Sequence, residues 1–270
     1  MKLRDAFAIL GFRNKPHQYG FEIKSFDLSK EGRVDYAQWL HPAESKKEIN
    51  QPAVDEIRKF LCPGDVAIDI GAHTGDSTIP IALAAGKEGC VLALEPNPYV
   101  FPVLSKNSEL NQDKTKIIPL MFAATAMSGD IRFEYSDEGF CNGGFHEGIS
   151  QWRHGHAYKL TVRGENLEEY LKLYYGYLIP RIRYIKVDAE GHDYSILQSL
   201  YGLIAAQQPY LKCEIYKHLN LEKRKQFFDF LKSFSYEVHR IESDSSYRGE
   251  FLTPEKLKNW RHYDIFCVPK

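Results

Sequence analysis

Several features that define other protein classes are missing from this chain of 270 residues. Its five cysteines are scattered and form no Cys-x-x-Cys pair, so neither a compact zinc motif nor a disulfide framework is indicated. No stretch approaches about eighteen apolar residues, and residues 1–10 carry charges where a signal peptide would have an apolar core. We therefore expect buried thiols in a reducing compartment, a cytoplasmic location and no membrane partner.

An excess of charge of either sign is also missing. The chain has 35 Lys and Arg against 36 Asp and Glu, which argues against double-stranded nucleic acid as a partner. With 43% hydrophobic residues it can bury one full core, although its length is near the upper limit for a single domain. We expect a cap or extension over residues 1–50 and a catalytic domain over 51–270. Nothing in the sequence indicates the oligomeric state.

Residues 66–75 read Val-Ala-Ile-Asp-Ile-Gly-Ala-His-Thr-Gly. The short β-branched run predicts a central parallel strand that is buried on both faces. Gly71 and Gly75 permit close backbone approach and positive φ, and residues 76–78 suit the first turn of a helix. Open α/β sheets bind ligands where such strands end. The segment therefore predicts a ligand site.

The glycine spacing and a second acid indicate the kind of ligand. Gly-x-x-x-Gly lacks the Gly-x-Gly-x-x-Gly pattern that seats a pyrophosphate, which disfavours a dinucleotide. Glu95 follows the next apolar strand, 26 residues after Asp69, where a carboxylate can accept hydrogen bonds from both ribose hydroxyls. An ordinary strand-helix turn with a surface Glu95 is the alternative. Ala124 either leaves room for a flat base or closes a tight turn, and both remain open.

The combination resembles the cofactor site of class I S-adenosylmethionine-dependent methyltransferases. The resemblance implies that the first acid and the glycines line the methionine and ribose end, while the second acid holds the ribose. It also implies an α/β, Rossmann-like fold with a seven-stranded, mostly parallel sheet in the order 3-2-1-4-5-7-6 and helices on both faces. The cofactor residues expected on this basis are Asp69, Gly71, Ala72, His73, Thr74, Gly75, Thr78, Glu95, Pro96, Asn97 and Ala124.

Between residues 128 and 163 the strand-helix alternation changes to strand-strand, because residues 131–135 and 158–162 alternate as antiparallel partners would. We expect a β insertion after the third strand. The intervening loop holds His146, His154 and His156, whose spacing matches no compact zinc signature, so a flexible lid is the better interpretation. Other elements expected are one strand within 19–28, helices at 52–61, 76–86, 98–110, 165–174 and 222–234, and strands at 116–122, 210–215, 236–241 and 262–268.

Residues 183–193 carry the chemistry. Ile-Lys-Val-Asp-Ala-Glu-Gly at 185–191, with Leu197 in the following helix, resembles the characteristic motif of the FkbM family of S-adenosylmethionine-dependent methyltransferases. With the two earlier motifs and the β insertion, the resemblance covers roughly residues 50–215. It implies O-methylation of a hydroxyl group on a small molecule or a saccharide.

Four side chains near this strand end are catalytic candidates. Asp188 is the first choice for orienting or deprotonating the acceptor, Glu190 could share that task, and Lys186 and His192 could orient it. Strand alternation places Lys186 and Asp188 on one face. The alternative for Glu190 and His192 is stabilisation of the helix N-terminus without a catalytic part.

Two further alternatives concern metal and function. Asp188 also matches the first metal ligand of divalent-cation-dependent catechol-type O-methyltransferases, but only Glu214 stands where those enzymes carry an Asp-Asn pair, so no metal is assigned. A nicotinamide-dependent oxidoreductase, a methyltransferase acting on RNA or protein, and a non-catalytic nucleoside-binding protein are the rival functions.

Overall fold

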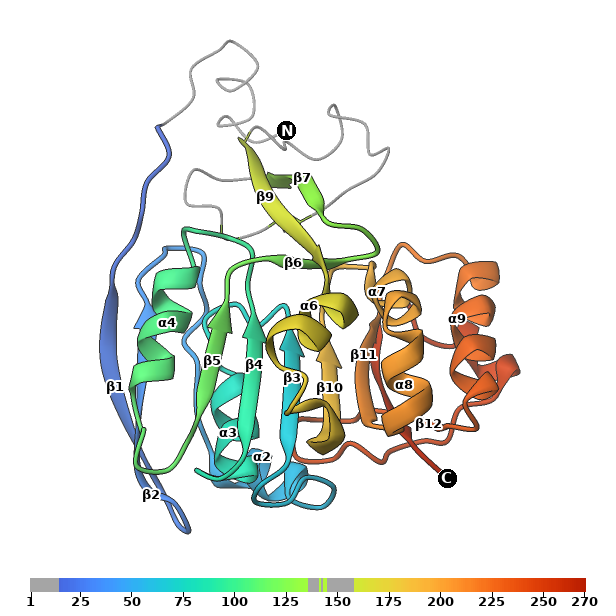
Figure 1. The fold of residues 1–270 in the computed structure, drawn as a ribbon, viewed down its shortest axis with the longest axis horizontal. Helices are drawn as coiled ribbons and strands as arrows, with labels where there is room; N and C mark the ends of the chain where they lie inside the picture. Colours follow the sequence, from blue (N-terminus) through green and yellow to red (C-terminus); the bar gives the residue numbers. More distant parts are fainter. Residues whose placement is uncertain (1–14, 136–140, 142, 145–157) are drawn as a thin grey trace.

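The computed structural model describes residues 15–135, 141, 143–144 and 158–270. Its centre is a seven-stranded sheet with helices on both faces (Figure 1). The strand order is β5-β4-β3-β10-β11-β13-β12, which confirms the predicted order 3-2-1-4-5-7-6. All neighbours are parallel except β13, which runs antiparallel to both β11 and β12. The strands are β3 (Val66–Ile70), β4 (Cys90–Leu94), β5 (Ile117–Leu120), β10 (Ile182–Val187), β11 (Tyr210–Ile215), β12 (Glu237–Arg240) and β13 (Tyr263–Val268).

The central strands are apolar throughout because both of their faces are buried. Within β3, Val66 and Ile68 pack into the hydrophobic cluster on one face, whereas Ala67 between them belongs to the cluster on the other. The first cluster is covered by α6 (Leu167–Tyr174), α7 (Asp193–Ser199), α8 (Tyr201–Gln207) and α9 (Leu221–Ser233). The second is covered by α2 (Gln51–Ile57) and α3 (Thr78–Ala85), with α4 (Phe101–Glu109) beside β5. Short 3₁₀ helices occupy Ile179–Arg181 and Pro254–Lys258.

Three details differ from the sequence expectation. The helix expected at 52–61 begins at Gln51, where the Asn50 side chain accepts from the Ala53 amide, but it ends at Ile57 because residues 58–60 tighten into turns. The helical spacing of Leu167, Tyr170, Leu171 and Tyr174 predicts a buried face, but Tyr174, in the last turn of α6, is 58% exposed. The break at Leu200 that divides α7 from α8 was not anticipated.

The first fifty residues hold a β-hairpin where one strand was expected. Strand β1 (Phe21–Leu28) pairs antiparallel with β2 (Gly32–Trp39). The side chain of Asn107 on α4 both accepts from the Ala37 amide and donates to its carbonyl, and it also donates to the Thr74 carbonyl at 2.7 Å. Tyr36 Oη lies 2.7 Å from Thr74 Oγ1. The hairpin is therefore attached directly to the glycine turn after β3. The domain division at residue 50 stays a prediction.

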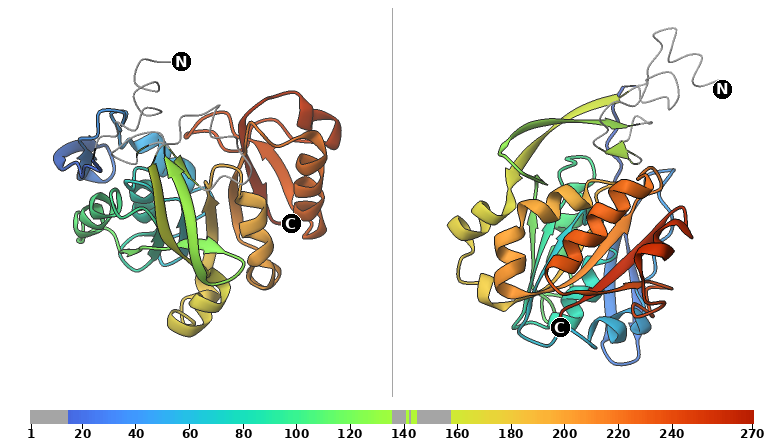
Figure 2. Two further views of the ribbon diagram at one scale, coloured as in Figure 1. Left: turned by 90° about the horizontal axis from the view of Figure 1, so that it is seen from above. Right: turned by 90° about the vertical axis from the view of Figure 1, so that its right-hand side faces the viewer.

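The β insertion forms a separate small sheet of order β6-β9-β7-β8 above the carboxyl ends of the central strands (Figure 2). Its strands are β6 (Ala123–Thr125), β7 (Gly129–Tyr135), β8 (Gly143–Gly144) and β9 (Tyr158–Asn166). Strands β7 and β9 pair antiparallel, with Ile131 opposite Val162, as the alternation predicted. The three histidines of the intervening loop, and most of the expected lid, lie outside the described residues.

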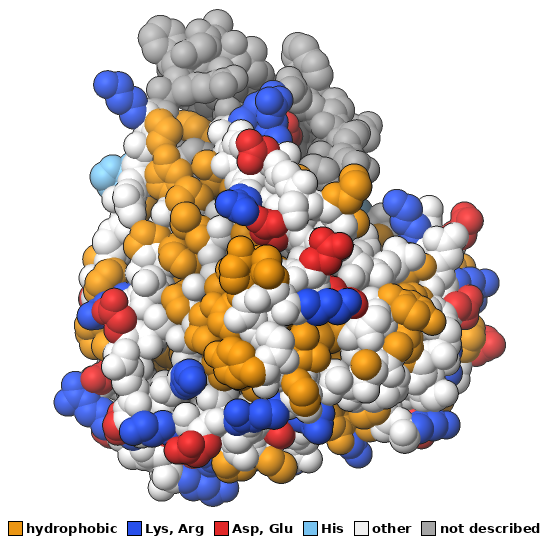
Figure 3. Space-filling model, in the orientation of Figure 1, with side chains coloured by type: hydrophobic (Ala, Val, Ile, Leu, Met, Phe, Trp, Pro, Cys, Tyr) orange, Lys and Arg blue, Asp and Glu red, His pale blue; other side chains and the backbone are white. Residues whose placement is uncertain are grey.

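Two surface properties follow from the composition. Acidic and basic side chains are interspersed on the face drawn in Figure 3, in keeping with the balanced charge of the sequence. Within the part of the chain that the structure describes, no helix combines the length and the hydropathy needed to cross a bilayer.

Candidate functional site

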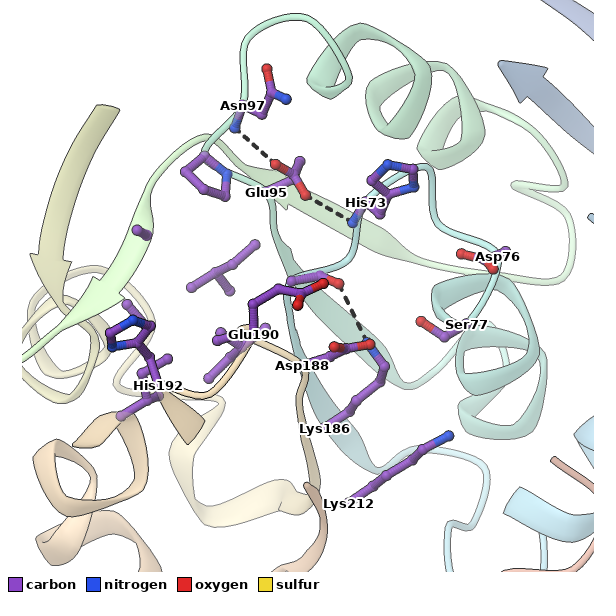
Figure 4. Close-up of a pocket in the computed structure, with 18 of the residues that line it drawn as sticks. His73, Asp76, Ser77, Glu95, Asn97, Lys186, Asp188, Glu190, His192 and Lys212 are labelled. Atoms are coloured by element: carbon purple, nitrogen blue, oxygen red, sulfur yellow. Dashed lines mark hydrogen bonds and ion pairs between the residues drawn. The ribbon is translucent and has the colours of Figure 1, made fainter. Parts of the chain in front are cut away.

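A cavity of about 1090 Å³ opens at the carboxyl ends of β3, β4, β10 and β11. The strand order reverses between β3 and β10, which is where open α/β sheets bind their ligands. Residues 43–50 close one side of the cavity, and β7 of the insertion closes another. In the close-up of Figure 4, Asp188 and Glu190 lie across the cavity from Glu95 and His73. The volume suits a nucleoside together with a second small molecule.

The glycine turn after β3 allows β10 to approach closely. Gly71 has φ +76°, and a Cβ built there would lie 2.1 Å from the carbonyl oxygen of Asp188. Its amide and that of Ala72 donate to the Leu94 carbonyl, which fixes the turn against the end of β4. Only glycine can take this backbone conformation beside that carbonyl. The turn therefore presents bare backbone to the cavity between the two strand ends.

Glu95 is a buried carboxylate that backbone hydrogen bonds hold in place. It is 7% exposed, and its two carboxylate oxygens accept from the backbone amides of His73 (3.0 Å) and Asn97 (2.8 Å). Burial raises the pKa of Glu95, and the nearby His73 and the two amides oppose that rise. Each carboxylate oxygen retains a free acceptor site. A vicinal diol such as that of ribose is the kind of group this carboxylate can bind.

Asp69 lies beneath the cavity lining, where it connects three elements of the fold. It is fully buried, and its carboxylate accepts from Ser77 Oγ (2.9 Å), Thr78 Oγ1 (2.7 Å) and Lys186 Nζ (3.0 Å). It thereby ties β3 to the start of α3 and to β10. Of the cofactor residues expected from the sequence, six line the cavity and five lie behind that lining. The lining ones are Gly71, His73, Glu95, Pro96, Asn97 and Ala124; those behind are Asp69, Ala72, Thr74, Gly75 and Thr78.

All four catalytic candidates line the cavity. Lys186 Nζ lies 3.0 Å from Asp69 Oδ1 and 3.7 Å from Asp188 Oδ2, so Lys186 and Asp188 do share a face. Burial lowers the pKa of Lys186, but the charges of Asp69 and Asp188 outweigh it and raise that pKa. Lys186 is therefore a fixed cation between two carboxylates, whereas half of the Asp188 side chain remains open to solvent.

Glu190 is positioned by an unusual backbone turn. It has φ +51°, and the following Gly191 has φ +98° and packs so closely on Tyr216 that a Cβ would lie 2.9 Å from its ring. Burial together with the negative charge of Asp188 raises the pKa of the Glu190 carboxyl group. A strained non-glycine residue held by its surroundings is common at functional sites.

The alternative role for Glu190 and His192 was stabilisation of the helix N-terminus. In the structure, Asp193 makes hydrogen bonds to backbone amides there. His192, the N-cap of α7, makes no side-chain capping hydrogen bond. Asp193, 1% exposed, instead accepts from the amides of Ala189 (3.2 Å) and Glu214 (2.8 Å). Burial raises the pKa of Asp193 to about 7. Asp193 thus holds the turn that carries Glu190, a role the sequence pattern did not indicate.

Of the potential metal ligands Asp188 and Glu214, Asp188 lines the cavity and Glu214 does not. Glu214 Oε1 lies 2.8 Å from His262 Nε2. Burial, then the charge of Asp188, raises the pKa of Glu214 to about 9. Among the described residues, the grouping of three potential ligand side chains within 4.8 Å of one another is Glu44, His73 and Cys141.

Several lining residues were missed by the sequence reasoning. Lys47 Nζ forms an ion pair of 2.9 Å with Asp76 Oδ2 at the start of α3. Lys212 lies beside Lys186 because the two residues are in register on parallel strands. Tyr216 and His218 follow β11 and also line the cavity. No motif marks any of them, since each reaches the cavity through contacts distant in sequence.

Comparison with known proteins gives one family. Residues 69–239, well over half of the chain, match the model of the methyltransferase FkbM domain. A curated relative, hexuronic acid methyltransferase AglP of Haloferax volcanii, is 30% identical over 136 residues, which cover 50% of each chain. This chain thus spans about half the length of that relative.

Among solved structures, a methyltransferase FkbM from Methylobacillus flagellatus matches with TM-score 0.45 and 14% identity, covering 81% of this chain and 50% of that one. Aeropyrum pernix fibrillarin with natively bound S-adenosyl-L-methionine matches with TM-score 0.46 and 12% identity, covering 94% and 97%. At such scores the fold assignment rests on the strand order of this chain. From that strand order, the motifs and the family match, the chain belongs to the methyltransferase FkbM domain family.

Proposed function

We propose that this protein transfers the methyl group of S-adenosylmethionine to an oxygen atom of a saccharide or similar small molecule. The observation that carries the proposal is one cavity with two unlike walls. One wall is a glycine turn beside a buried diol-binding carboxylate, and the other is a pair of carboxyl groups, Asp188 and Glu190. The family match favours this function over the oxidoreductase alternative.

The residues on the first wall fit the cofactor. Gly71 lets the ends of β3 and β10 meet without a side chain between them, and Glu95 keeps acceptor sites for two ribose hydroxyls. Ala124 and Pro96 leave a shallow apolar surface for a base at the end of β4 and β5. Bound S-adenosylmethionine supplies an electrophilic methyl group on a positively charged sulfur. The negative charges of Asp188, Glu190 and Glu95 favour that positive charge in the cavity.

The second wall provides a base for the acceptor. Methyl transfer to a hydroxyl requires the oxygen to lose its proton and to be aligned with the methyl group. Glu190 lines the cavity, and its raised pKa makes its carboxylate a better base than an exposed glutamate. Asp188 stands between Glu190 and the Lys186 ammonium, where it can accept a hydrogen bond from a second acceptor hydroxyl. We assign deprotonation to Glu190 and orientation to Asp188, the reverse of the order that the sequence favoured.

The acceptor is proposed to be an acidic sugar. The relative that is 30% identical carries the name hexuronic acid methyltransferase, and this supports a sugar acid as substrate here. Lys217 and His218 lie where β11 ends and can attract a carboxylate.

Transfer of isotope-labelled methyl groups tests the proposal. The protein is incubated with labelled S-adenosylmethionine and matched acceptors, glucuronate and glucose glycosides, with bulk RNA and a mixed peptide pool as the rival acceptors. Label in the glucuronoside, reduced at least tenfold for the glucoside, is expected. Label in RNA or peptides would contradict the acceptor class, and binding of S-adenosylhomocysteine with no transfer to any acceptor would favour a non-catalytic nucleoside-binding protein.

A further inference from the structure

An ion pair in the cavity wall has no part in the chemistry above. Lys47 Nζ and Asp76 Oδ2 lie 2.9 Å apart, with side chains 24% and 32% exposed, and both residues line the cavity. Figure 4 shows Asp76 and Ser77 side by side at the start of α3, away from the Asn97 end of the cavity. An ion pair whose side chains are both partly open to solvent contributes little to stability. Its place in the wall calls for another explanation.

We propose that Lys47 and Asp76 bind the amino-acid end of the cofactor, with Lys47 holding the α-carboxylate and Asp76 the α-ammonium group. This inference rests on the proposed function. The amino-acid end of S-adenosylmethionine is a zwitterion, so its complement is a cation and an anion held side by side. A wall with one sign of charge would bind one end of the zwitterion and repel the other.

The two side chains keep their charges at neutral pH. Burial alone would lower the pKa of Lys47, but the Asp76 carboxylate outweighs it and raises that pKa. Burial alone would raise the pKa of Asp76, but the Lys47 ammonium outweighs it and lowers that pKa. Glu44 Oε1 lies 3.5 Å from Lys47 Nζ, and its negative charge also helps to keep Lys47 protonated. A cation for the α-carboxylate and an anion for the α-ammonium group are therefore both available.

The backbone that carries Lys47 is fixed in place. The Lys47 amide donates to Gln38 Oε1 at 2.8 Å, and Gln38 Nε2 donates to the Ser45 carbonyl at 3.2 Å. Gln38 is 4% exposed in β2, and the hairpin is attached to the glycine turn through Asn107 and Thr74. Two partly buried hydrogen bonds thus hold the segment in one register. Lys47 is preorganised against the cavity, which limits the entropy lost on binding.

The position also agrees with the rest of the cavity. Asp76 directly precedes Ser77, the N-cap of α3, and Ser77 is tied to Asp69 beneath the glycine turn. A ligand that has its ribose on Glu95 and crosses the turn at Gly71 reaches this ion pair from the side opposite the base. The segment 43–50, expected to be part of a cap, thereby becomes part of the cofactor site.

Calorimetric titration with two adenosine ligands separates this role from others. S-adenosylhomocysteine has the amino-acid end, and 5′-methylthioadenosine lacks it but keeps the adenosine and sulfur. Lys47→Met should weaken binding of S-adenosylhomocysteine about 10- to 100-fold, the loss of a charge-assisted hydrogen bond. Binding of 5′-methylthioadenosine should change less than about twofold. Asp76→Asn should behave in the same way.

Three variants serve as controls. Lys46→Met removes an exposed neighbouring lysine that does not line the cavity, and both ligands should bind as in the wild type. Lys212→Met removes another lysine of the lining; a selective loss of S-adenosylhomocysteine there, with Lys47→Met unaffected, would overturn the assignment. Glu95→Ala should weaken both ligands. Circular dichroism melting establishes that each variant is folded.

The failures of the two proposals are distinguishable. Equal weakening of both ligands in Lys47→Met would mean that Lys47 only supports the wall, and the inference would be wrong while the cofactor assignment stands. A wild-type protein that binds neither ligand would remove the proposed function itself.

Discussion

The two walls of the cavity are built in different ways. The wall at β3 and β4 consists of backbone turns, with Gly71 and Glu95 held by main-chain hydrogen bonds within a stretch of about thirty residues. The wall at β10 and β11 consists of carboxyl groups whose surroundings include distant parts of the chain: Asp188 pairs with Lys186, and Lys186 also binds Asp69, which lies 117 residues away. The first wall is suited to binding an unchanging ligand, and the second to tuning proton affinity for one reaction.

The largest effect is expected on the second wall. Glu190→Gln keeps the shape of the side chain but cannot accept a proton, so kcat should fall about 10²- to 10⁴-fold while affinity for S-adenosylhomocysteine stays unchanged. Glu237→Gln, in an exposed strand position distant from the lining, is the matched control. Wild-type turnover in Glu190→Gln would remove Glu190 from the mechanism and return the role to Asp188.

A change in the first wall should act on folding. Gly71→Ala places a Cβ against the Asp188 carbonyl at φ +76°, so we expect the free energy of unfolding to fall by about 3 kcal/mol or more. Gly32→Ala, at φ +67° with open space around it, should cost only about 1 kcal/mol of backbone strain. Denaturant unfolding measures both, and equal losses would show that the close approach of β10 is unimportant.

Glu95→Ala tests the ribose contact. Loss of two hydrogen bonds to a charged acceptor should weaken S-adenosylhomocysteine about 10- to 100-fold in a calorimetric titration. NAD, run in parallel, should bind neither protein with comparable affinity. A preference for NAD over S-adenosylhomocysteine in the wild type would contradict the cofactor assignment.

The smallest effect is a shift in pH dependence. Transfer requires the Glu190 carboxylate, so kcat/KM should fall as pH drops through the pKa of that group, which burial and the Asp188 charge raise. Asp188→Asn removes that negative charge, so the pKa of Glu190 should decrease and the acid limb of the profile should move to lower pH. An acid limb that moves to higher pH or does not move would contradict the proposed electrostatic coupling of Glu190 and Asp188.

The sequence predicts the first wall well because its determinants are local. The motifs around Gly71 and Glu95 lie within short segments, and the family resemblance that they carry implied the strand order and six lining residues. Asp69 shows the limit of such reasoning. It was expected to face the cofactor, yet Lys186, which lies 117 residues further along the chain, takes one of its oxygens and keeps it beneath the lining.

The motif at 185–191 predicted the carboxyl groups of the second wall, but their surroundings and the hairpin could not be predicted, for related reasons. Strand β2 buries four consecutive residues, Tyr36 to Trp39, because the hairpin packs on α4 and on the glycine turn, and such a run lacks the alternation that marks a strand. Tyr216 and Lys47 carry no motif, and their neighbours in the cavity depend on the finished fold. Proton affinities on this wall likewise depend on burial, which composition does not reveal.

A crystal structure with S-adenosylhomocysteine tests the central claim most directly. We expect both ribose hydroxyls within hydrogen-bond distance of the Glu95 carboxylate and the sulfur on the side of Asp188 and Glu190. A nucleoside bound elsewhere, or one whose sulfur faces away from those two carboxyl groups, would contradict the account.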